Sequence, residues 1–304
     1  MQKKALAVAI AGAMVPVAAQ AVSYKISGHV NRALQFIDDG KGSQVRNVDN
    51  ANSRSRFRFV GSEKFGRMQA GIYVALGMAS NRTTNTAGKN SGNDGDAPSG
   101  SGGDSFDGAN DDIRHSALWF SGSWGKLTMG HTADTFEGIA AADLSGTFLA
   151  TNVYDGTTTT GALFFRTTGG GVGTDMGVAF NSLDGGRIDL IRYDSPALGP
   201  FKVGIYSAND EEWGATGYLN TSLAGGKLRA QLGYQDEDNR SGFSGIGGSA
   251  SFLFSQGTAL TFGFSNRDFV AAGRDDATIL YFKLGHKWGN NAVAIDYFNG
   301  EDTS

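Results

Sequence analysis

The chain has 304 residues, no cysteine, and 26 Lys and Arg against 30 Asp and Glu, which gives a net charge of −4. A net negative charge argues against nucleic acid as a partner, because phosphate binding requires a basic surface. Without cysteine the chain cannot be held by disulfides, so an extended sheet, a bound partner or a membrane has to stabilise it.

The first 21 residues have the three parts of a secretory signal peptide. Lys3 and Lys4 precede an apolar run from Ala5 to Val15, and the segment ends on Ala19-Gln20-Ala21. The apolar run is too short to anchor the chain in a bilayer as a helix. The sequence therefore predicts an exported protein whose mature chain begins near Val22.

Alternation with a period of two predicts β-strands from Ser23 onward. The first three strands are expected over Ser23 to Ile37, about Asn52 to Ser62, and Met68 to Met78. The second contains SRSRFRFVG, where arginines alternate with phenylalanines. Because successive side chains of a strand point to opposite faces, Arg54, Arg56 and Arg58 would form a ladder on one face.

Residues 81–112 are rich in Gly, Ser, Asn and Asp, which predicts a long surface loop. Its acidic part, residues 94–112, has carboxylates that could bind Ca²⁺, but their spacing does not match an EF-hand, so a solvated loop is favoured. The four histidines lie on separate elements without metal-ligand spacing. We therefore predict no metal site and no cofactor.

Two further strands are expected over residues 113–121 and 125–131, and the alternation then stops until about residue 187. Eight more strands follow, over residues 187–195, 201–210, 215–223, 227–235, 244–254, 259–266, 278–287 and 292–298. Short turns and longer loops alternate between the strands, as on the two rims of a membrane barrel. The alternative is a secreted β-sandwich adhesin or binding protein, which would stay soluble without detergent. No serine lies in a G-x-S-x-G elbow, so we do not expect an enzyme.

The stretches VSYKISGHVNRALQF, SRSRFRFVGSEKFGRMQAGIYV, ALWFSGSWGKLTMGH and RYDSPALGPFKVGIYS together resemble Gram-negative general porins. The resemblance implies an all-β fold, an antiparallel transmembrane β-barrel of 16 strands that forms a homotrimer in the cell outer membrane, among lipid and lipopolysaccharide. Its function would be passive diffusion of ions and small hydrophilic solutes. About 13 strands and no C-terminal strand ending in an aromatic residue are present, so residues 22–304 are expected to be an incomplete barrel domain.

The resemblance also implies that the third loop, from His131 to about Gly186, folds into the lumen. Acidic residues on that loop would face arginines on the barrel wall, and the expected pore constriction consists of Arg54, Arg56, Arg58, Arg114, Asp134, Glu137 and Asp143. The arginine ladder must face the lumen if Phe57 and Phe59 face lipid, since a charge on the lipid face costs about 2–4 kcal/mol at mid-bilayer. The acidic loops favour cations and the arginines favour anions, so the ion preference stays open.

Overall fold

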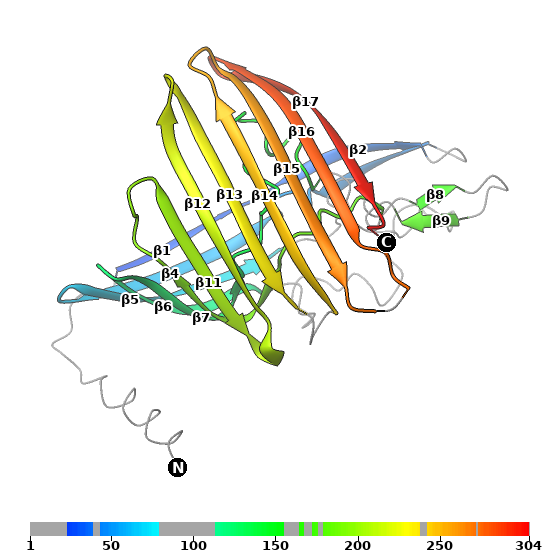
Figure 1. Cartoon of the computed structure of the whole chain (residues 1–304). Coiled ribbons are helices and arrows are strands. Elements are labelled where there is room, and N and C mark those ends of the chain that lie inside the picture. Colours follow the sequence, from blue (N-terminus) through cyan, green and yellow to red (C-terminus); the bar gives the residue numbers. More distant parts are fainter. Residues whose placement is uncertain are drawn as a thin grey trace.

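The computed structural model describes residues 23–38, 43–78, 113–154, 164–166, 172–175, 179–237, 242–271 and 273–303. Within them, one antiparallel sheet contains thirteen strands in the order β1, β4 to β7 and β10 to β17 (Figure 1). Their bounds are β1 Ser23–His29, β4 Arg56–Phe65, β5 Met68–Gly77, β6 Ile113–Gly122, β7 Gly125–Ala133, β10 Arg187–Asp194, β11 Phe201–Ala208, β12 Trp213–Leu223, β13 Gly226–Asp236, β14 Phe243–Leu253, β15 Thr258–Phe269, β16 Ala277–Trp288 and β17 Asn291–Glu301.

Two small hairpins and a 3-10 helix complete the described elements: β2 (Arg32–Asp38) with β3 (Ser43–Asp49), β8 (Phe164–Arg166) with β9 (Val172–Asp175), and η1 (Asn209–Glu211). In the described part of the chain, no helix has the length and apolar character needed to cross a membrane. The predicted signal peptide over residues 1–21 and the acidic stretch 94–112 lie outside the described residues.

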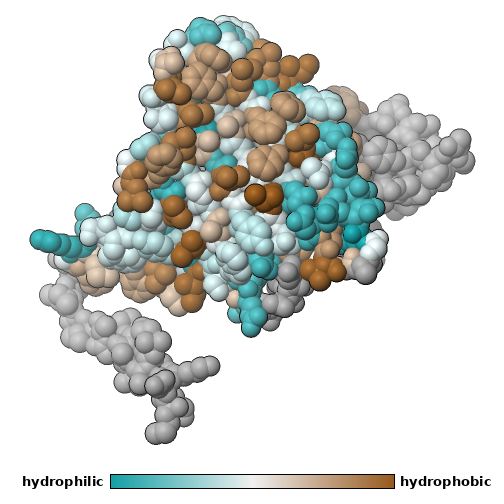
Figure 2. All heavy atoms as spheres, viewed as in Figure 1, coloured by the Kyte–Doolittle hydropathy of each residue, from teal (hydrophilic) through white to brown (hydrophobic). Residues whose placement is uncertain are grey.

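The strands carry apolar side chains on their outward face. Leu232, Leu260 and Ile295 are 56%, 50% and 72% exposed there, and Figure 2 shows apolar side chains spread over this side of the molecule. Small or polar side chains alternate with them and are buried on the inner face, as with Thr261 beside Leu260 on β15. This alternation is what a strand with one side in lipid requires. The prediction of an antiparallel, all-β fold with thirteen strands is confirmed.

The connections also separate two rims, as predicted. Two residues each connect β4 to β5, β6 to β7, β12 to β13 and β16 to β17, which places these turns together on what we call the short-turn rim. The longest connections, between β5 and β6 and between β7 and β10, leave from the opposite, long-loop rim. The first lies outside the described residues, and the second contributes to the site described below.

The prediction of one strand from Ser23 to Ile37 is wrong, because the pairing is interrupted after His29. The last pair between β1 and β4 is His29 with Arg56, and the first pair between β2 and β3 is Arg32 with Asp49. Between these two pairs, the six residues 50–55 lie opposite only residues 30 and 31. The Asn31 amide holds this bulge by donating hydrogen bonds to the carbonyls of Asn52 (2.8 Å) and Ser53 (3.2 Å). The predicted strand over 52–62 therefore begins only at Arg56.

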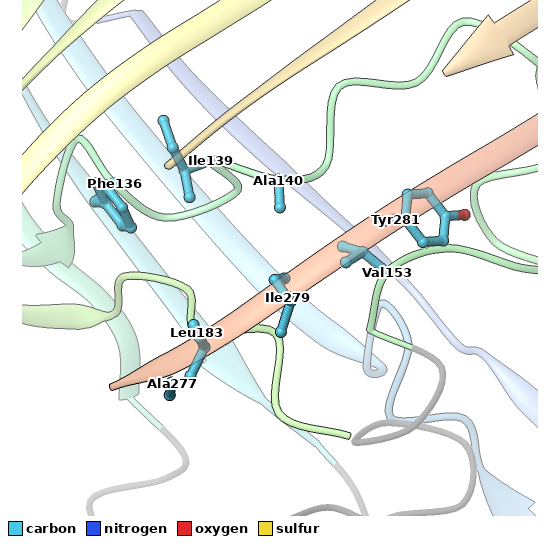
Figure 3. Packing of buried hydrophobic residues seen from close by; sticks show 8 residues of the cluster. All are labelled: Phe136, Ile139, Ala140, Val153, Leu183, Ala277, Ile279 and Tyr281. Atoms are coloured by element: carbon cyan, nitrogen blue, oxygen red, sulfur yellow. The ribbon is translucent and has the colours of Figure 1, made fainter. Parts of the chain in front are cut away.

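The main hydrophobic core lies between the sheet and a segment of the β7–β10 connection. The side chains of the connection that contribute to the core are Phe136, Ile139, Ala140, Val153 and Leu183. They pack on the inner face of β16, on Ala277, Ile279 and Tyr281 (Figure 3). Phe136 and Ile279 are fully buried. We refer to residues 134–154 as the inner segment, since they lie against the concave side of the sheet.

Candidate functional site

The inner segment follows the inner faces of β12 to β16 and is fixed there by hydroxyl side chains. Ser249 Oγ donates to the Ile139 carbonyl (2.6 Å) and accepts from the Ala142 N–H (3.0 Å), and the Leu144 N–H donates to Ser251 Oγ (3.0 Å). Thr216 Oγ1 donates to the Thr135 carbonyl at 2.8 Å. These bonds satisfy backbone groups that irregular structure would otherwise leave unpaired.

The strands beneath the inner segment have small side chains, which allow a close approach. A Cβ atom at Gly263 would lie 2.5 Å from the Ala140 carbonyl oxygen, closer than non-bonded atoms permit. Serine, threonine and glycine on the inner faces of β14 and β15 therefore provide both the hydrogen-bonding groups and the space for this segment.

The segment begins three residues later than predicted. His131 and Thr132 still belong to β7 and pair with Asp189 and Ile188 of β10, so the connection starts at Asp134 and not at His131. The Asp134 carboxylate accepts hydrogen bonds from the N–H groups of Phe136 (2.7 Å), Glu137 (2.6 Å) and Gly186 (2.5 Å). It thus connects the start of the connection to its end.

Asp184 ties the same two parts together from the other side. One of its oxygens accepts from the N–H groups of Gly138 (2.6 Å) and Ile139 (3.1 Å), and the other accepts from the Tyr154 hydroxyl (2.8 Å). Burial raises the pKa of Asp184 to about 7 and that of Asp134 to about 6, although their hydrogen-bond donors favour the charged forms. Both carboxylates therefore take part in the local structure of the segment.

A cavity of about 890 Å³ separates the inner segment from the opposite wall of the sheet. Its positively charged lining consists of Arg54, Arg56, Arg114, Arg187 and Arg229, and its acidic lining of Glu137, Asp143 and Asp184. Of the seven residues predicted for the constriction, the cavity brings together Arg54, Arg56, Arg114, Glu137 and Asp143. Arg58 and Asp134 do not line it.

The arginines reach the cavity in different ways. Arg56 and Arg58 lie on β4, but Arg54 lies in the bulge over residues 50–55, so the three do not form one continuous strand ladder. On β6, the register jumps from His115, opposite Ala75, to Ile113, opposite Leu76. Arg114 is the extra residue of this β-bulge. Such a residue can be turned toward the opposite face of the sheet, and Arg114 lines the cavity.

Ion pairs and one amide fix the acidic side of the cavity. The Arg187 guanidinium pairs with the Glu137 carboxylate. The Lys283 ammonium lies 2.7 Å from an Asp143 oxygen, and both side chains are at least 95% buried, with exposures of 1% and 5%. The Asn52 amide donates to the carbonyls of Phe148 (3.2 Å) and Leu149 (3.3 Å), which connects the bulge to the far end of the inner segment.

Sequence reasoning missed Arg187, Arg229, Asp184 and Lys283. Arg229 and Lys283 could have been found, because each alternates along its strand with outward apolar residues, Leu228 and Leu284 among them. Arg187 and Asp184 flank Gly185-Gly186, in a stretch with no alternation. Nothing in the local sequence indicates that they reach the cavity.

An antiparallel wall with apolar side chains outside and a charged, partly filled interior defines a membrane β-barrel channel. The chain belongs to the Gram-negative porin family, whose family model matches residues 5–304. It is a porin of the outer membrane. The search of curated proteins found no match.

Solved structures agree with this fold. A multiple mutant of the Rh. blastica porin aligns with a TM-score of 0.55 and 14% identity, covering 92% of this chain and 85% of that one. The outer membrane channel DcaP of Acinetobacter baumannii aligns with a TM-score of 0.52 and 12% identity, covering 92% and 80%. At these identities the similarity shows the shared barrel fold.

Proposed function

We propose that the 890 Å³ cavity is the narrow zone of a water-filled channel for passive diffusion of ions and small hydrophilic solutes, and that it favours anions. The observation that supports this most directly is the position of the inner segment, which is hydrogen-bonded across the inner faces of β12 to β16. A segment fixed inside the barrel narrows the lumen at its own level. The channel would work without catalysis or a cofactor.

The charges of the cavity support the preference for anions. Five guanidinium groups line it against three carboxylates. One carboxylate, Asp143, is already neutralised by Lys283, and the pKa of Asp184 is raised by burial to about 7, so this group is partly uncharged near neutral pH. Local charge at the narrowest point decides ion selectivity in a channel, so the net charge of −4 for the whole chain matters less.

The proposal includes all seven residues of the predicted constriction, in two groups. Arg54, Arg56, Arg114 and Glu137 would contact permeating solutes, since they line the cavity, whereas Asp143 would hold the inner segment through its buried ion pair with Lys283. Arg58 would add positive charge to the same wall, and Asp134 would hold the base of the inner segment. Arg187 and Arg229 join the first group.

Reconstitution of the purified protein in a planar bilayer tests the proposal. The wild-type protein should give steady ion conductance, and R54Q/R56Q/R114Q should conduct with its reversal potential in a KCl gradient moved toward that of K⁺. The matched control is R67Q, which removes one arginine from the short β4–β5 turn. A folded protein without conductance refutes the channel, and equal reversal potentials for the two variants and the wild type refute the arginine wall.

The assembly and processing of the chain complete the proposal. We expect a homotrimer whose outward apolar residues, such as Leu260 and Ile295, contact lipid and lipopolysaccharide, and a signal peptide over residues 1–21 that is removed from the barrel domain over 22–304. Mass measurement of the detergent-solubilised protein and sequencing of its mature N-terminus test these two points. A monomer, or a mature chain that keeps Met1, would contradict them.

A further inference from the structure

A second cavity, of about 550 Å³, lies on the inner face nearer the short-turn rim and shares no lining residue with the first. Its lining is part aromatic and part cationic, with Tyr73, Trp119, Lys126, Arg192 and Lys202 as the large side chains. Lys126 and Lys202 are each the second residue of a strand that follows a connection at that rim. A solute that has passed the inner segment would meet this cavity next.

The Trp119 indole is held flat against the wall. It pairs across the strands with Gly71, where a Cβ atom would lie 2.5 Å from the ring atom Cζ2, so the absence of a side chain at Gly71 makes room for the ring. The Lys126 ammonium lies 5.3 Å from the centre of the indole, within the range of a cation–π contact. The ring and the ammonium therefore form one preorganised unit beside the cavity.

The charges of this cavity are not balanced within the described residues. Arg192 forms a bidentate pair with Asp194 (3.1 and 2.9 Å) and also donates to the carbonyls of Ala133 and Asp134, so its charge is already paired. In the part of the chain that the structure describes, neither Lys126 nor Lys202 forms an ion pair. Asp194, opposite Lys126 in the β7–β10 pair, attracts its ammonium group, whereas Arg192 and Lys202 repel it, so three cations share one carboxylate in this lining. A bound anion would relieve that repulsion.

We propose that this cavity is a binding subsite for small aromatic carboxylates. Lys126 and Lys202 bind the carboxylate, and the flat ring lies against Trp119, with Val60 and Ala117 as apolar floor. The cavity combines aromatic surface with convergent cationic groups, and its volume falls within the range of about 300–1,000 Å³ that is usual for ligand pockets. The inference rests on the proposed channel function, since the subsite faces the lumen.

Equilibrium dialysis of the detergent-solubilised protein against benzoate tests the subsite without depending on conduction. Benzoate should bind saturably and more tightly than cyclohexanecarboxylate, which has the same charge and similar size but no flat ring. W119L should weaken benzoate binding about five- to tenfold and remove the difference between the two ligands. K202Q should weaken both ligands about tenfold, because a charge-assisted hydrogen bond is lost.

The matched control is K227Q, which neutralises an exposed lysine at the equivalent position of β13, outside the cavity lining. It should bind benzoate as the wild-type protein does. Equal affinity for the two ligands, or equal loss in K227Q and K202Q, overturns the subsite. Saturable binding by a protein that conducts no ions would instead refute the channel and leave the subsite, so the two proposals fail in different ways.

Discussion

Replacing Lys283 by Met should release the inner segment from the wall. The Lys283 ammonium is 2.7 Å from Asp143 and 2.5 Å from the Thr151 carbonyl, and the side chains of the ion pair are 1% and 5% exposed. Removing one partner of a buried ion pair leaves the other charge without compensation, at a cost of about 3–5 kcal/mol. The segment can avoid this cost by moving Asp143 into water. The equilibrium for leaving the wall should then rise by about two to four orders of magnitude.

Hydrogen exchange at the amides of Ala142 and Leu144 measures this equilibrium, because both are bonded to serines of the wall. Exchange should accelerate at least about 100-fold in K283M. K283M/D143N should recover most of the protection, since no buried charge is left. K25M, which removes an exposed lysine on β1, is the control. If K283M exchanges no faster than K25M, the ion pair does not hold the segment and our reasoning about it is wrong.

Two more predictions concern the same segment. N52A loses both hydrogen bonds to the Phe148 and Leu149 carbonyls, so hydrogen exchange at residues 147–151 should rise about tenfold. The control N220A, on β12, should leave this exchange unchanged. Equal exchange rates in both variants would show that Asn52 does not hold the inner segment. The pKa of Asp184 is raised by burial from 3.8 to about 7, so the folded state binds its proton more tightly than the unfolded state. The free energy of unfolding should therefore fall as the pH rises from about 4 to 7 and then level off. D184N should reduce this dependence, leaving the smaller part that comes from Asp134, and D275N, at an exposed site, should not change it. A wild-type protein with constant stability over that range would contradict the shift.

The strands were predictable where one face meets lipid and the other does not. On β5, Met68, Ile72 and Leu76 alternate with Gly71 and other small or polar inner residues, and this pattern predicts a strand and assigns each residue to one face. β16 has Ile279 and Tyr281 on the inner face as well as Leu280 and Phe282 outside, so its alternation is weak. The inner residues are apolar because the inner segment covers them, and this contact is between residues far apart in sequence.

The site was predictable only in part, for a related reason. A β-bulge changes the face that a side chain occupies without leaving a sequence signal. Two bulges bring arginines to the cavity lining: one on β6 contributes Arg114, and the one over residues 50–55 contributes Arg54. Neither Val30 nor Asn31, the two residues of the interruption after His29, is a Gly or Pro. The Asn31 side chain takes over hydrogen bonds that a regular strand partner would make.

The sign of the reversal potential of the wild-type protein tests the central claim most directly. In a tenfold KCl gradient, perfect selectivity would give about 59 mV, toward the Cl⁻ potential for anions and toward the K⁺ potential for cations. Five arginines line the cavity against three carboxylates, and Asp143 among these is paired with Lys283, so we expect a value between zero and the Cl⁻ limit. A value of zero, or one on the K⁺ side, would contradict it.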